Sequence, residues 1–356
     1  PRGEAGVVGA GGAVAAVFCF VPLYLMIRFG ILGFGLHAVK RLMPGFAEAK
    51  NCKVSALSRR KLEEAKASAK QFNIPLAFDS AEELCKSKEV DAVFVATPNA
   101  NHLDDVLLAL KHGKPVLVEK PMGMNAGECK KMVEAAHKAK LLLGVAQVFR
   151  FENSTARLRE RIAAHELGKI TFARSEFSYP GRAHARQWLN KRSIAGGGPV
   201  ADVGVHCIDA LRFILQDEVL RVSARTTADR DSGDVEAAAV VSLEFGRGAL
   251  GAVLVSTRAA YRTPLEIVGE NGVLRADNAL SVEEPIRIEL LRNGEIVDSE
   301  RVSNHGAYAR QVDAFADALV GKGSFPAPGE EGWTNQMILD AAYRSAKSGK
   351  TEKVSS

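Results

Sequence analysis

Two residues that could move a proton stand out by their spacing. Asp202 and His206 lie four residues apart in GGGPVADVGVHCID, so a helix there places both side chains on one face, with Asp209 near it. Histidine titrates close to neutral pH, as a general acid–base requires, and a nearby carboxylate can orient it. The alternatives are an N-cap role for Asp202 and a packed helix position for His206, with the preceding glycines 196–198 as a flexible entrance.

Lys120 is a third candidate for proton chemistry. It follows the apolar run PVLVE and precedes Pro121, which fixes its position at the end of a predicted strand. Beside a positively charged ligand, its ammonium would meet positive charge and partial desolvation, and both favour the neutral amine and ease proton exchange. Taken alone, the residue type and position favour an ordinary surface lysine.

Two glycine-rich strings could hold the pyrophosphate of a dinucleotide, and their surroundings distinguish them. The first, 9–12, has only eight residues before it, and no second strand follows at a suitable distance. The second, GFGLHA at 33–38, follows the apolar run 26–32 and opens a helical pattern over 37–50 that is interrupted near Pro44-Gly45. Only the second string has the strand–turn–helix setting that a G-x-G-x-x-A motif requires.

Each small residue of GFGLHA has a physical task. Gly33 permits the tight turn, Gly35 lets the backbone approach a phosphate, and Ala38 keeps the helix close to the sheet. The N–H groups at the helix start, around Leu36 and His37, and the positive end of its dipole then face the pyrophosphate. These five residues are predicted to bind a dinucleotide.

The end of the next predicted strand, 52–57, indicates which dinucleotide. An NAD enzyme usually has Asp or Glu there to bind the ribose hydroxyls, whereas this chain has Ser58, Arg59 and Arg60. The planar fork of arginine suits a 2′-phosphate. The sequence therefore favours NADP, with NAD as the alternative if the two arginines merely open the charged helix that follows.

The chain divides into two halves by its pattern of elements. Strand and helix patterns alternate over 26–148, which predicts an α/β doubly wound parallel sheet of the Rossmann type. Such sheets bind ligands at the carboxyl ends of their strands, where the sequence places Thr97, Pro98, Asn99, Glu119 and Lys120. Over 149–356 a helix leads into long alternating strands and then two helices, near 307–320 and 333–348, which predicts an α+β domain with a large open, mostly antiparallel sheet.

Composition excludes several classes of protein. The 356 residues are 47% hydrophobic and 25% charged, and the net charge of +5 is spread along the chain, which does not favour nucleic-acid binding. The five cysteines are odd in number and lack C-x-x-C spacing, which indicates reduced thiols, a cytoplasmic protein and no bound metal.

The first 25 residues are uncharged from Ala5 onward, and this uncharged run is long enough to span a bilayer. It leads directly into the first predicted strand without a linker. We therefore expect residues 1–25 to be an extension outside the fold and membrane attachment to be absent, with an anchor or atypical leader as the alternative.

Several of these motifs together resemble the glucose–fructose oxidoreductase / inositol dehydrogenase (Gfo/Idh/MocA) family. They are GFGLHA, VEKP, GGGPVADVGVHCID and the segment from Tyr308 through Gln311 to Phe315, and the similarity runs from Met26 to the end. The resemblance implies a catalytic Lys120 that hydrogen-bonds the substrate oxygen. It also implies that His206 exchanges the proton and that Asp202 positions the substrate or His206. Whether Lys120 or His206 is the main acid–base stays open.

The resemblance adds further candidates around the two ligands. Asn99, His102 and Gln147 correspond to positions near the nicotinamide ribose and the interdomain cleft, although His102 could simply begin a helix. Arg150 could touch the substrate or brace the hinge. Trp188 could wall the site, since an aromatic face suits a sugar ring, and nearby weaker pocket candidates are Tyr179, Arg182 and His184.

The activity that these expectations describe is an NADP-preferring oxidoreductase. It would act on a sugar, a cyclitol or a related polyol, as a homodimer or homotetramer formed through the second sheet. Two rivals use the same scaffold: an NAD-dependent glycosidase with transient oxidation, and a nucleotide-sensing binding protein without catalysis.

Overall fold

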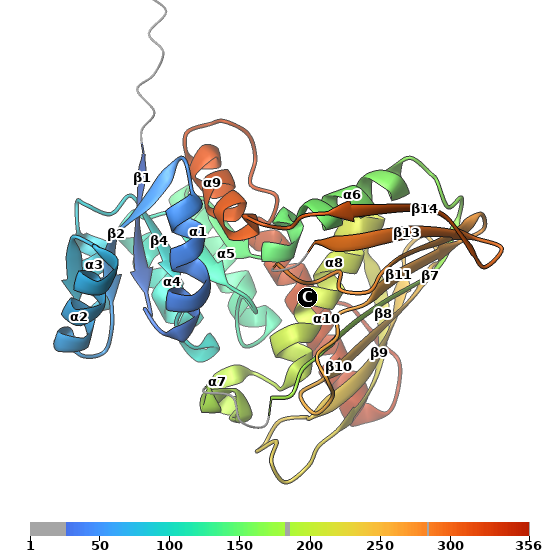
Figure 1. The fold of residues 1–356 in the computed structure, drawn as a ribbon. Helices are drawn as coiled ribbons and strands as arrows, with labels where there is room; N and C mark the ends of the chain where they lie inside the picture. The colour runs from blue at the N-terminus through green and yellow to red at the C-terminus, as the bar shows by residue number, and fades with distance from the viewer. Residues whose placement is uncertain (1–25, 182–185, 283–284, 356) are drawn as a thin grey trace, which may run out of the picture.

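The computed structural model describes residues 26–181, 186–282 and 285–355, which form two sheets side by side with helices between and around them (Figure 1). The first sheet is parallel, with strand order β3-β2-β1-β4-β5-β6. Its strands are β1 (Ile27–Leu32), β2 (Cys52–Ser58), β3 (Leu76–Phe78), β4 (Ala92–Val95), β5 (Val116–Glu119) and β6 (Leu143–Ala146). This is the predicted Rossmann sheet.

Helices cover both faces of the first sheet, so most of its strands lose contact with water on both sides. All four residues of β4 and of β6 are buried, which explains why these strands are continuous apolar runs rather than alternating ones. The helices of this half are α1 (Met43–Glu48), α2 (Leu62–Phe72), α3 (Ala81–Lys86), α4 (His102–Lys111) and α5 (Ala126–Ala139).

The helix after the glycine turn differs from the prediction, because it is not interrupted at Pro44. A π-helical turn (Ala38–Leu42) leads directly into α1 (Met43–Glu48), and Pro44 lies just after that turn, where the chain changes from π-helical to α-helical. Gly45 lies against Cβ of Tyr308, so the glycine allows a close approach rather than ending the helix.

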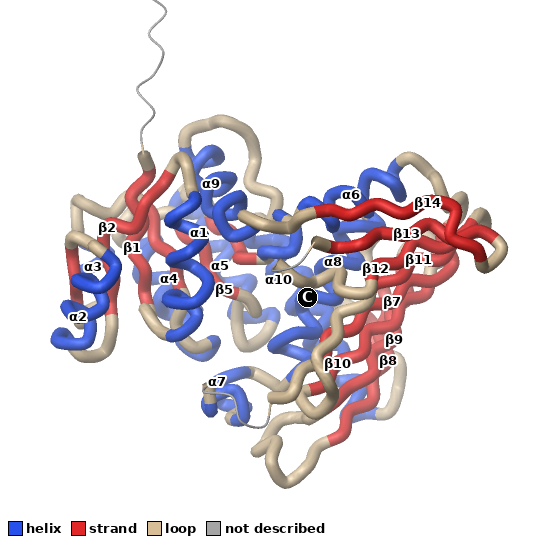
Figure 2. Tube along the Cα trace, in the orientation of Figure 1, coloured by secondary structure: helices blue, strands red, loops and turns tan. Residues whose placement is uncertain are grey.

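The second sheet has nine strands in the order β14-β13-β12-β11-β7-β10-β9-β8-β15 and is antiparallel except for the β7–β10 pair (Figure 2). Its strands are β7 (Ile170–Ser178), β8 (Val219–Thr227), β9 (Ala238–Phe245), β10 (Leu250–Ser256), β11 (Leu265–Gly269), β12 (Gly272–Ala276), β13 (Ile286–Arg292), β14 (Glu295–Val302) and β15 (Glu352–Lys353). The prediction of a large, mostly antiparallel sheet is confirmed.

One face of the second sheet packs on helices α6 (Asn153–Ala163), α8 (Val205–Leu215) and α10 (Gly329–Ser348), while the other is open (Figure 1). Burial alternates along β9, where Val241 and Leu243 point into the core and Val240 points outward. This alternation places the main core of the second half between the sheet and these three helices.

Helices near the end of the chain pack against both halves. Helix α9 (Ala307–Leu319) and the segment after it return to the first sheet, where Phe315 and Phe325 join an apolar cluster with Phe29. Helix α10 then lies under the second sheet. Both helices fall close to the predicted ranges, but α9 completes the core of the half that is distant in sequence.

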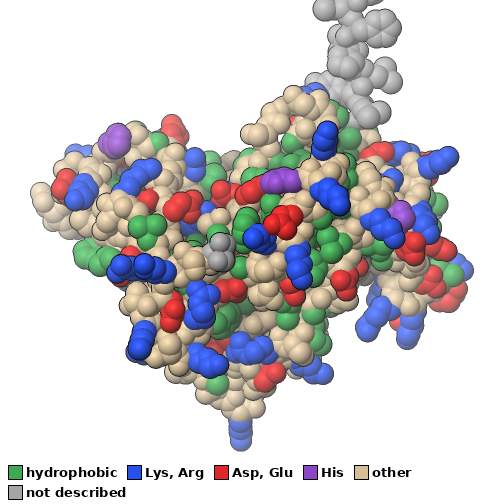
Figure 3. All heavy atoms as spheres, turned by 180° about the vertical axis from the view of Figure 1, so that it is seen from behind, with side chains coloured by type: hydrophobic (Ala, Val, Ile, Leu, Met, Phe, Trp, Pro, Cys, Tyr) green, Lys and Arg blue, Asp and Glu red, His purple; other side chains and the backbone are tan. Residues whose placement is uncertain are grey.

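The surface mixes charges of both signs over the face shown in Figure 3. Within the described ranges, no helix is long and apolar enough to cross a membrane, and no three His, Cys, Asp or Glu side chains are arranged to hold a metal ion. Cys52, Cys85, Cys129 and Cys207 are free and buried. The predicted extension 1–25, with its glycine string, lies outside the described residues.

Candidate active site

A cavity of about 1050 Å³ lies between the two halves and is lined by both. Ligand pockets usually measure about 300–1,000 Å³, so this one can hold a large ligand together with a small one. The first half contributes the glycine turn and the residues that follow β2, β4 and β5, while the second half contributes mainly aromatic and apolar side chains. From the first half, the lining includes Gly33, Gly35, Leu36, His37, Arg59, Arg60, Thr97, Pro98, Asn99, Glu119 and Lys120.

The glycine turn has the geometry of a phosphate cradle. Gly33 has φ +81°, and a Cβ there would lie 2.7 Å from the backbone nitrogen of Thr97, so no larger residue fits. The turn is tied down by a hydrogen bond from the Phe34 N–H to the carbonyl of Ser58, 3.0 Å long. The residues of this turn therefore fit a dinucleotide pyrophosphate at the start of the helix.

Charged side chains gather at the end of the cavity beyond the glycine turn. Arg59 pairs with Glu64 at 3.0 Å and donates to the Ser68 hydroxyl at 3.0 Å, while Arg60 and Arg41 also line the cavity. The sequence has no carboxylate directly after β2, but Glu64, in the first turn of α2, reaches Arg59. Three guanidinium groups and one carboxylate thus surround this end.

Lys120 from the first half meets Asp202 from the second. The Lys120 ammonium donates to the backbone carbonyl of Asp202 at 2.6 Å, and its Nζ lies 3.4 Å from Oδ1 of the carboxylate. The other carboxylate oxygen, Oδ2, accepts a hydrogen bond from the Tyr179 hydroxyl at 2.7 Å. Three side chains from distant parts of the sequence therefore form one polar group at the cavity wall.

The charges around Asp202 keep it ionised. Burial alone raises its pKa, but Lys120, Arg186, the Tyr179 hydroxyl and His206 together outweigh burial, so the pKa of Asp202 lies well below its ordinary value. Burial, together with the neighbouring carboxylate, raises the pKa of Tyr179 far above its ordinary value. At neutral pH Tyr179 is therefore a stable donor to a permanently charged Asp202.

His206 lies at the same wall between two aromatic rings. Its ring meets Phe149 edge-on with centroids 4.6 Å apart and lies roughly parallel to Phe177 at 6.2 Å. Burial is the main cause that lowers the pKa of His206, and the positive charge of the nearby Lys120 is the second. The pKa therefore lies well below 6.5, and the imidazole is neutral at neutral pH. Its Nδ1 has no hydrogen-bond partner among the described residues, and the Asp202 carboxylate accepts hydrogen bonds from Lys120 and Tyr179 instead.

Two further ionisable residues, Glu119 and His37, line the cavity on the side of the first sheet. Glu119 is partly buried, accepts a hydrogen bond at 2.8 Å from Nε2 of His37 and also accepts the N–H of Lys120. Burial raises the pKa of Glu119, but His37 outweighs it, and the net pKa is lowered. The pair links the start of the glycine-turn helix to the strand end that carries Lys120.

His102 does not line the cavity. It is fully buried, and its two ring nitrogens lie 3.0 Å from the carbonyl oxygen of Pro121 and 2.9 Å from that of Thr97. The histidine therefore joins the ends of β4 and β5 below Lys120. Its observed contacts are those of a supporting residue, whereas a cofactor contact was expected.

Four other predicted ligands also lie outside the cavity lining. Ser58 contributes its carbonyl to the glycine turn, and Ala38 is buried in the apolar core. Gln147 is buried, with an Oε1 that has no hydrogen-bond partner among the described residues. Arg150 lies in a separate polar network.

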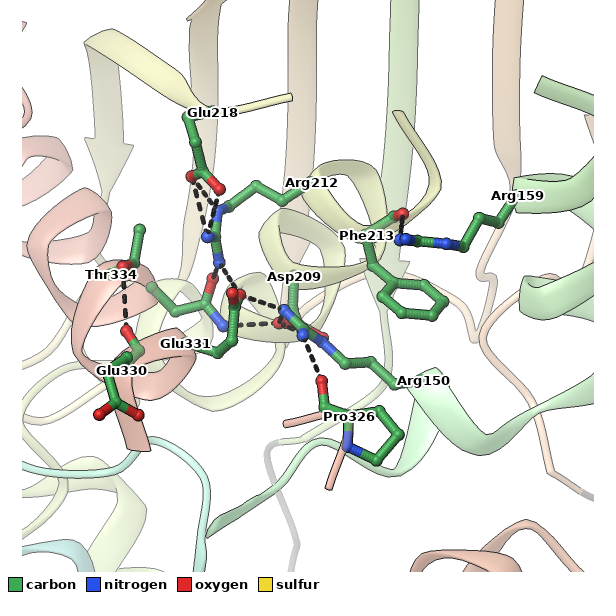
Figure 4. Close-up of polar contacts among 11 residues, drawn as sticks. Arg150, Arg159, Asp209, Arg212, Phe213, Glu218, Pro326, Glu330, Glu331 and Thr334 are labelled. Atoms are coloured by element: carbon green, nitrogen blue, oxygen red, sulfur yellow. Dashed lines mark hydrogen bonds and ion pairs between the residues drawn. The ribbon is translucent and has the colours of Figure 1, made fainter. Parts of the chain in front are cut away.

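That network is drawn in Figure 4 and joins α8 to α10. The Arg150 guanidinium is 5% exposed, donates to both oxygens of Asp209 at 2.7–3.0 Å, and also reaches Glu331 at 2.7 Å and the carbonyl of Pro326 at 2.8 Å. Arg212 contacts Glu331 from the other side at 3.1 Å. These contacts match the hinge-bracing alternative for Arg150 and explain why Asp209 does not face the cavity.

Several lining residues were missed or only weakly indicated by the sequence. Trp188 and Tyr179 line the cavity, whereas Arg182 and His184 lie outside the described residues. Missed residues in helices are Arg41 after the glycine turn, Glu64 in α2, and Tyr308 in α9, which was quoted only as part of a family motif. Missed residues in loops, where no motif marks them, are Arg186, Tyr261, Leu280, Ser281 and Val282.

Known proteins share both halves of this architecture. Residues 27–147 match the family described as "Oxidoreductase family, NAD-binding Rossmann fold", and residues 155–275 match the "GFO/IDH/MocA C-terminal domain". D-xylose 1-dehydrogenase (NADP(+)) 2 of Haloferax volcanii is 33% identical over 324 residues, which cover 90% of this chain and 98% of that protein. The chain belongs to the GFO/IDH/MocA oxidoreductase family.

A second relative is similar over nearly the whole chain, and a solved structure shares the fold. The 1,5-anhydro-D-fructose reductase of Ensifer adhaerens is 29% identical over 332 residues, which cover 92% of this chain and 99% of that protein. The crystal structure of the aldose-aldose oxidoreductase of Caulobacter crescentus, complexed with glycerol, superposes with a TM-score of 0.85 at 24% identity, covering 92% of this chain and 99% of that one. As a GFO/IDH/MocA member, the chain is an oxidoreductase that depends on a nicotinamide dinucleotide.

Proposed function

We propose that this GFO/IDH/MocA member transfers hydride between NADP and a carbon of a sugar, cyclitol or related polyol that carries a hydroxyl or carbonyl group. One observation carries the proposal: Lys120, Asp202 and His206 converge on the cavity onto which the glycine turn opens. A bound nicotinamide would accept or supply the hydride.

The chain's own residues would handle the proton and the charge on oxygen. Oxidation of an alcohol removes a hydride from carbon and a proton from oxygen, so oxygen becomes more negative as the reaction proceeds. The Lys120 ammonium, held by Asp202, would donate a hydrogen bond to that oxygen. The imidazole of His206, which lines the cavity and is neutral at neutral pH, would accept the proton.

The proposed preference for NADP rests on charge. Arg41, Arg59 and Arg60 outnumber Glu64 at the end of the cavity beyond the glycine turn, which favours the doubly charged 2′-phosphate over a hydroxyl. Arg60 forms no hydrogen bond or ion pair with the described residues and is the guanidinium most readily available to a phosphate. The Haloferax volcanii relative carries NADP(+) in its name, which agrees with this preference.

Turnover followed through nicotinamide absorbance, over a panel of sugars, cyclitols and polyols, tests the activity. We expect Lys120→Ala and His206→Ala each to lower kcat/KM by about 10²–10⁴-fold, as loss of acid–base catalysis does. Lys130→Ala, at an exposed position of α5, is the matched control and should leave kcat/KM unchanged. Unchanged turnover in the first two variants would contradict the assigned roles, and hydrolysis without net reduction would indicate the glycosidase alternative.

The cofactor preference has its own test. The wild-type ratio of kcat/KM with NADP to that with NAD should exceed one, and Arg60→Ala should lower the ratio by about tenfold through loss of a charged contact. Glu64→Gln, which removes the opposing carboxylate, should raise the ratio. Equal or better use of NAD by the wild-type protein would refute the preference.

We also propose that two copies associate through the open face of the second sheet. Phe172 lies beside Leu250, and Val240 lies beside Leu254, so four exposed apolar side chains lie as two pairs on one face of neighbouring strands, with Ala252 between the pairs. A second copy presenting the same face would bury them. Phe172→Glu should therefore shift the molecular mass in solution to that of a monomer, and an unshifted mass would exclude this interface.

A further inference from the structure

One buried carboxylate outside the cavity holds the segment that leads to Asp202 and His206. Glu236, in the loop between β8 and β9, is 4% exposed. Its Oε1 accepts hydrogen bonds from the backbone N–H groups of Gly198 and Val200, each 3.0 Å long, and from the Tyr343 hydroxyl at 2.9 Å. Glu236 therefore binds the backbone of the segment directly.

The held segment is the start of the helix that carries the reacting residues. A π-helical turn (Val200–Gly204) precedes α8, and the first N–H groups of a helix lack partners within it. Glu236 supplies such a partner from another part of the chain, at the helix end where a negative charge is favoured. The Asp202 N–H donates a hydrogen bond to the carbonyl of Gly198 at 2.9 Å. Only one residue lies between Asp202 and Val200, whose N–H binds Glu236.

The glycines of this segment are required by packing, which corrects the expectation of a flexible entrance. A Cβ on Gly197 would collide with the Tyr343 hydroxyl, and one on Gly198 would collide with the backbone carbonyl of Glu236. Gly198 is also buried. Glycine is present here because the backbone must approach Glu236 and Tyr343 closely.

The same segment is also held from the first half of the chain. The Asn99 amide, which follows β4 and lines the cavity, donates to the carbonyl of Ala195 at 2.9 Å. On the other side, Arg192 lies 3.4 Å from Oε2 of Glu236 and over the ring of Tyr343 at 5.3 Å. The segment therefore lies between a contact from the nucleotide-binding half and a charged anchor in the second half.

We infer that Glu236 is a positioning residue of the oxidoreductase reaction. It sets the position of the π-helical turn, and through that turn it sets the distance from Asp202 to Lys120 and the placement of His206 in the cavity. It touches neither the cavity nor the residues expected to bind the dinucleotide. The inference rests on the proposed roles of Lys120, Asp202 and His206.

Three substitutions test this role. Glu236→Ala removes the acceptor for both N–H groups, whereas Glu236→Gln keeps one acceptor oxygen and removes the charge. Glu289→Gln is the matched control, because Glu289 is also buried in the second sheet and pairs with Arg275 at 2.7 Å, but it does not line the cavity. Thermal unfolding of each variant shows whether it is folded at the assay temperature.

We expect kcat to fall by up to about 10²-fold in Glu236→Ala, because small misplacements of reacting groups carry costs of that order. In Glu236→Gln the fall should be about threefold to tenfold, since one backbone acceptor survives. The dissociation constant of NADPH, measured by fluorescence titration, should stay within about twofold of the wild-type value, since the cofactor contacts are intact. The primary isotope effect with deuterated substrate should rise, because hydride transfer becomes slower relative to the other steps.

Two results would overturn the inference: wild-type kcat and isotope effect in a folded Glu236→Gln, or an equal loss in Glu289→Gln. If Glu236→Ala does not fold, the Glu236→Gln variant alone decides. Lys120→Ala and Asp202→Asn are assayed alongside. If they leave turnover unchanged, the proposed function fails; if they abolish it while Glu236→Gln is unaffected, only the positioning role fails.

Discussion

Replacing Arg150 with methionine separates its two suggested roles, bracing and substrate contact. Methionine has a similar length and no charge, so Arg150→Met removes the guanidinium while largely filling its space. In the native protein Arg150 gives three hydrogen bonds to Asp209 and one each to Glu331 and to the carbonyl of Pro326. Neither Arg150 nor Asp209 lines the cavity.

The cost of this change can be worked out from the partners that remain. Glu331 keeps its ion pair with Arg212 at 3.1 Å, whereas Asp209, only 1% exposed, keeps only the amide of Asn335 at 2.7 Å. Leaving one buried charge without its partner typically costs about 3–5 kcal/mol. Since only one carboxylate loses its cation, we expect the free energy of unfolding to fall by about 3 kcal/mol, the lower end of that range.

Urea unfolding followed by fluorescence measures this loss, with steady-state kinetics on the folded variant. The double variant Arg150→Met/Asp209→Asn should recover much of the stability, because no buried charge then lacks a partner. Arg157→Met is the control: Arg157 pairs with Glu160 and Glu300 while 39% exposed, so its loss should cost about 1 kcal/mol or less. A cost below about 1 kcal/mol for Arg150→Met, together with a raised KM for the substrate, would refute bracing and favour substrate contact.

Two other perturbations have defined outcomes. Gly33→Ala should abolish NADPH binding in a fluorescence titration, because its Cβ would meet the backbone of Thr97 at a φ of +81°; Gly113→Ala, also at positive φ but facing open space, should leave binding intact. The folded-state pKa of His206 lies below 6.5, so the stability from its neutral form is complete above that pH and is lost as the pH falls below it. Acidification from neutral pH to about 5 should therefore destabilise wild type more than His206→Asn in urea unfolding, and an equal loss would contradict a buried neutral imidazole.

Local rules account for much of the fold and part of the site. Alternating strand and helix patterns predicted the first sheet, and period-two alternation predicted the second. Short stretches of chain were enough to indicate the candidate acid–base residues. They show the four-residue spacing of Asp202 and His206 and the position of Lys120 at a strand end. The convergence of these residues was expected from the family resemblance, because neither stretch by itself places the second half of the chain beside the first.

The remaining site residues depend on contacts that no short stretch specifies. Arg150 follows a strand end and resembles a ligand in sequence, but α10 brings Glu331 to it from far along the chain. His102 occupies a ligand-like position, yet both of its ring nitrogens lie within 3.0 Å of backbone carbonyl oxygens and do not face the cavity. Glu236 lies in a loop with no motif, and its role follows only from the glycine backbone packed against it.

The return of α9 to the first sheet has a consequence for synthesis on the ribosome. The first six strands emerge well before Phe315 and Phe325, so the nascent nucleotide-binding half exposes an unfilled apolar groove until nearly the whole chain is made. Truncation before residue 307 would leave that groove uncovered for good. A stop codon late in the gene would thus damage the part of the enzyme that was translated first.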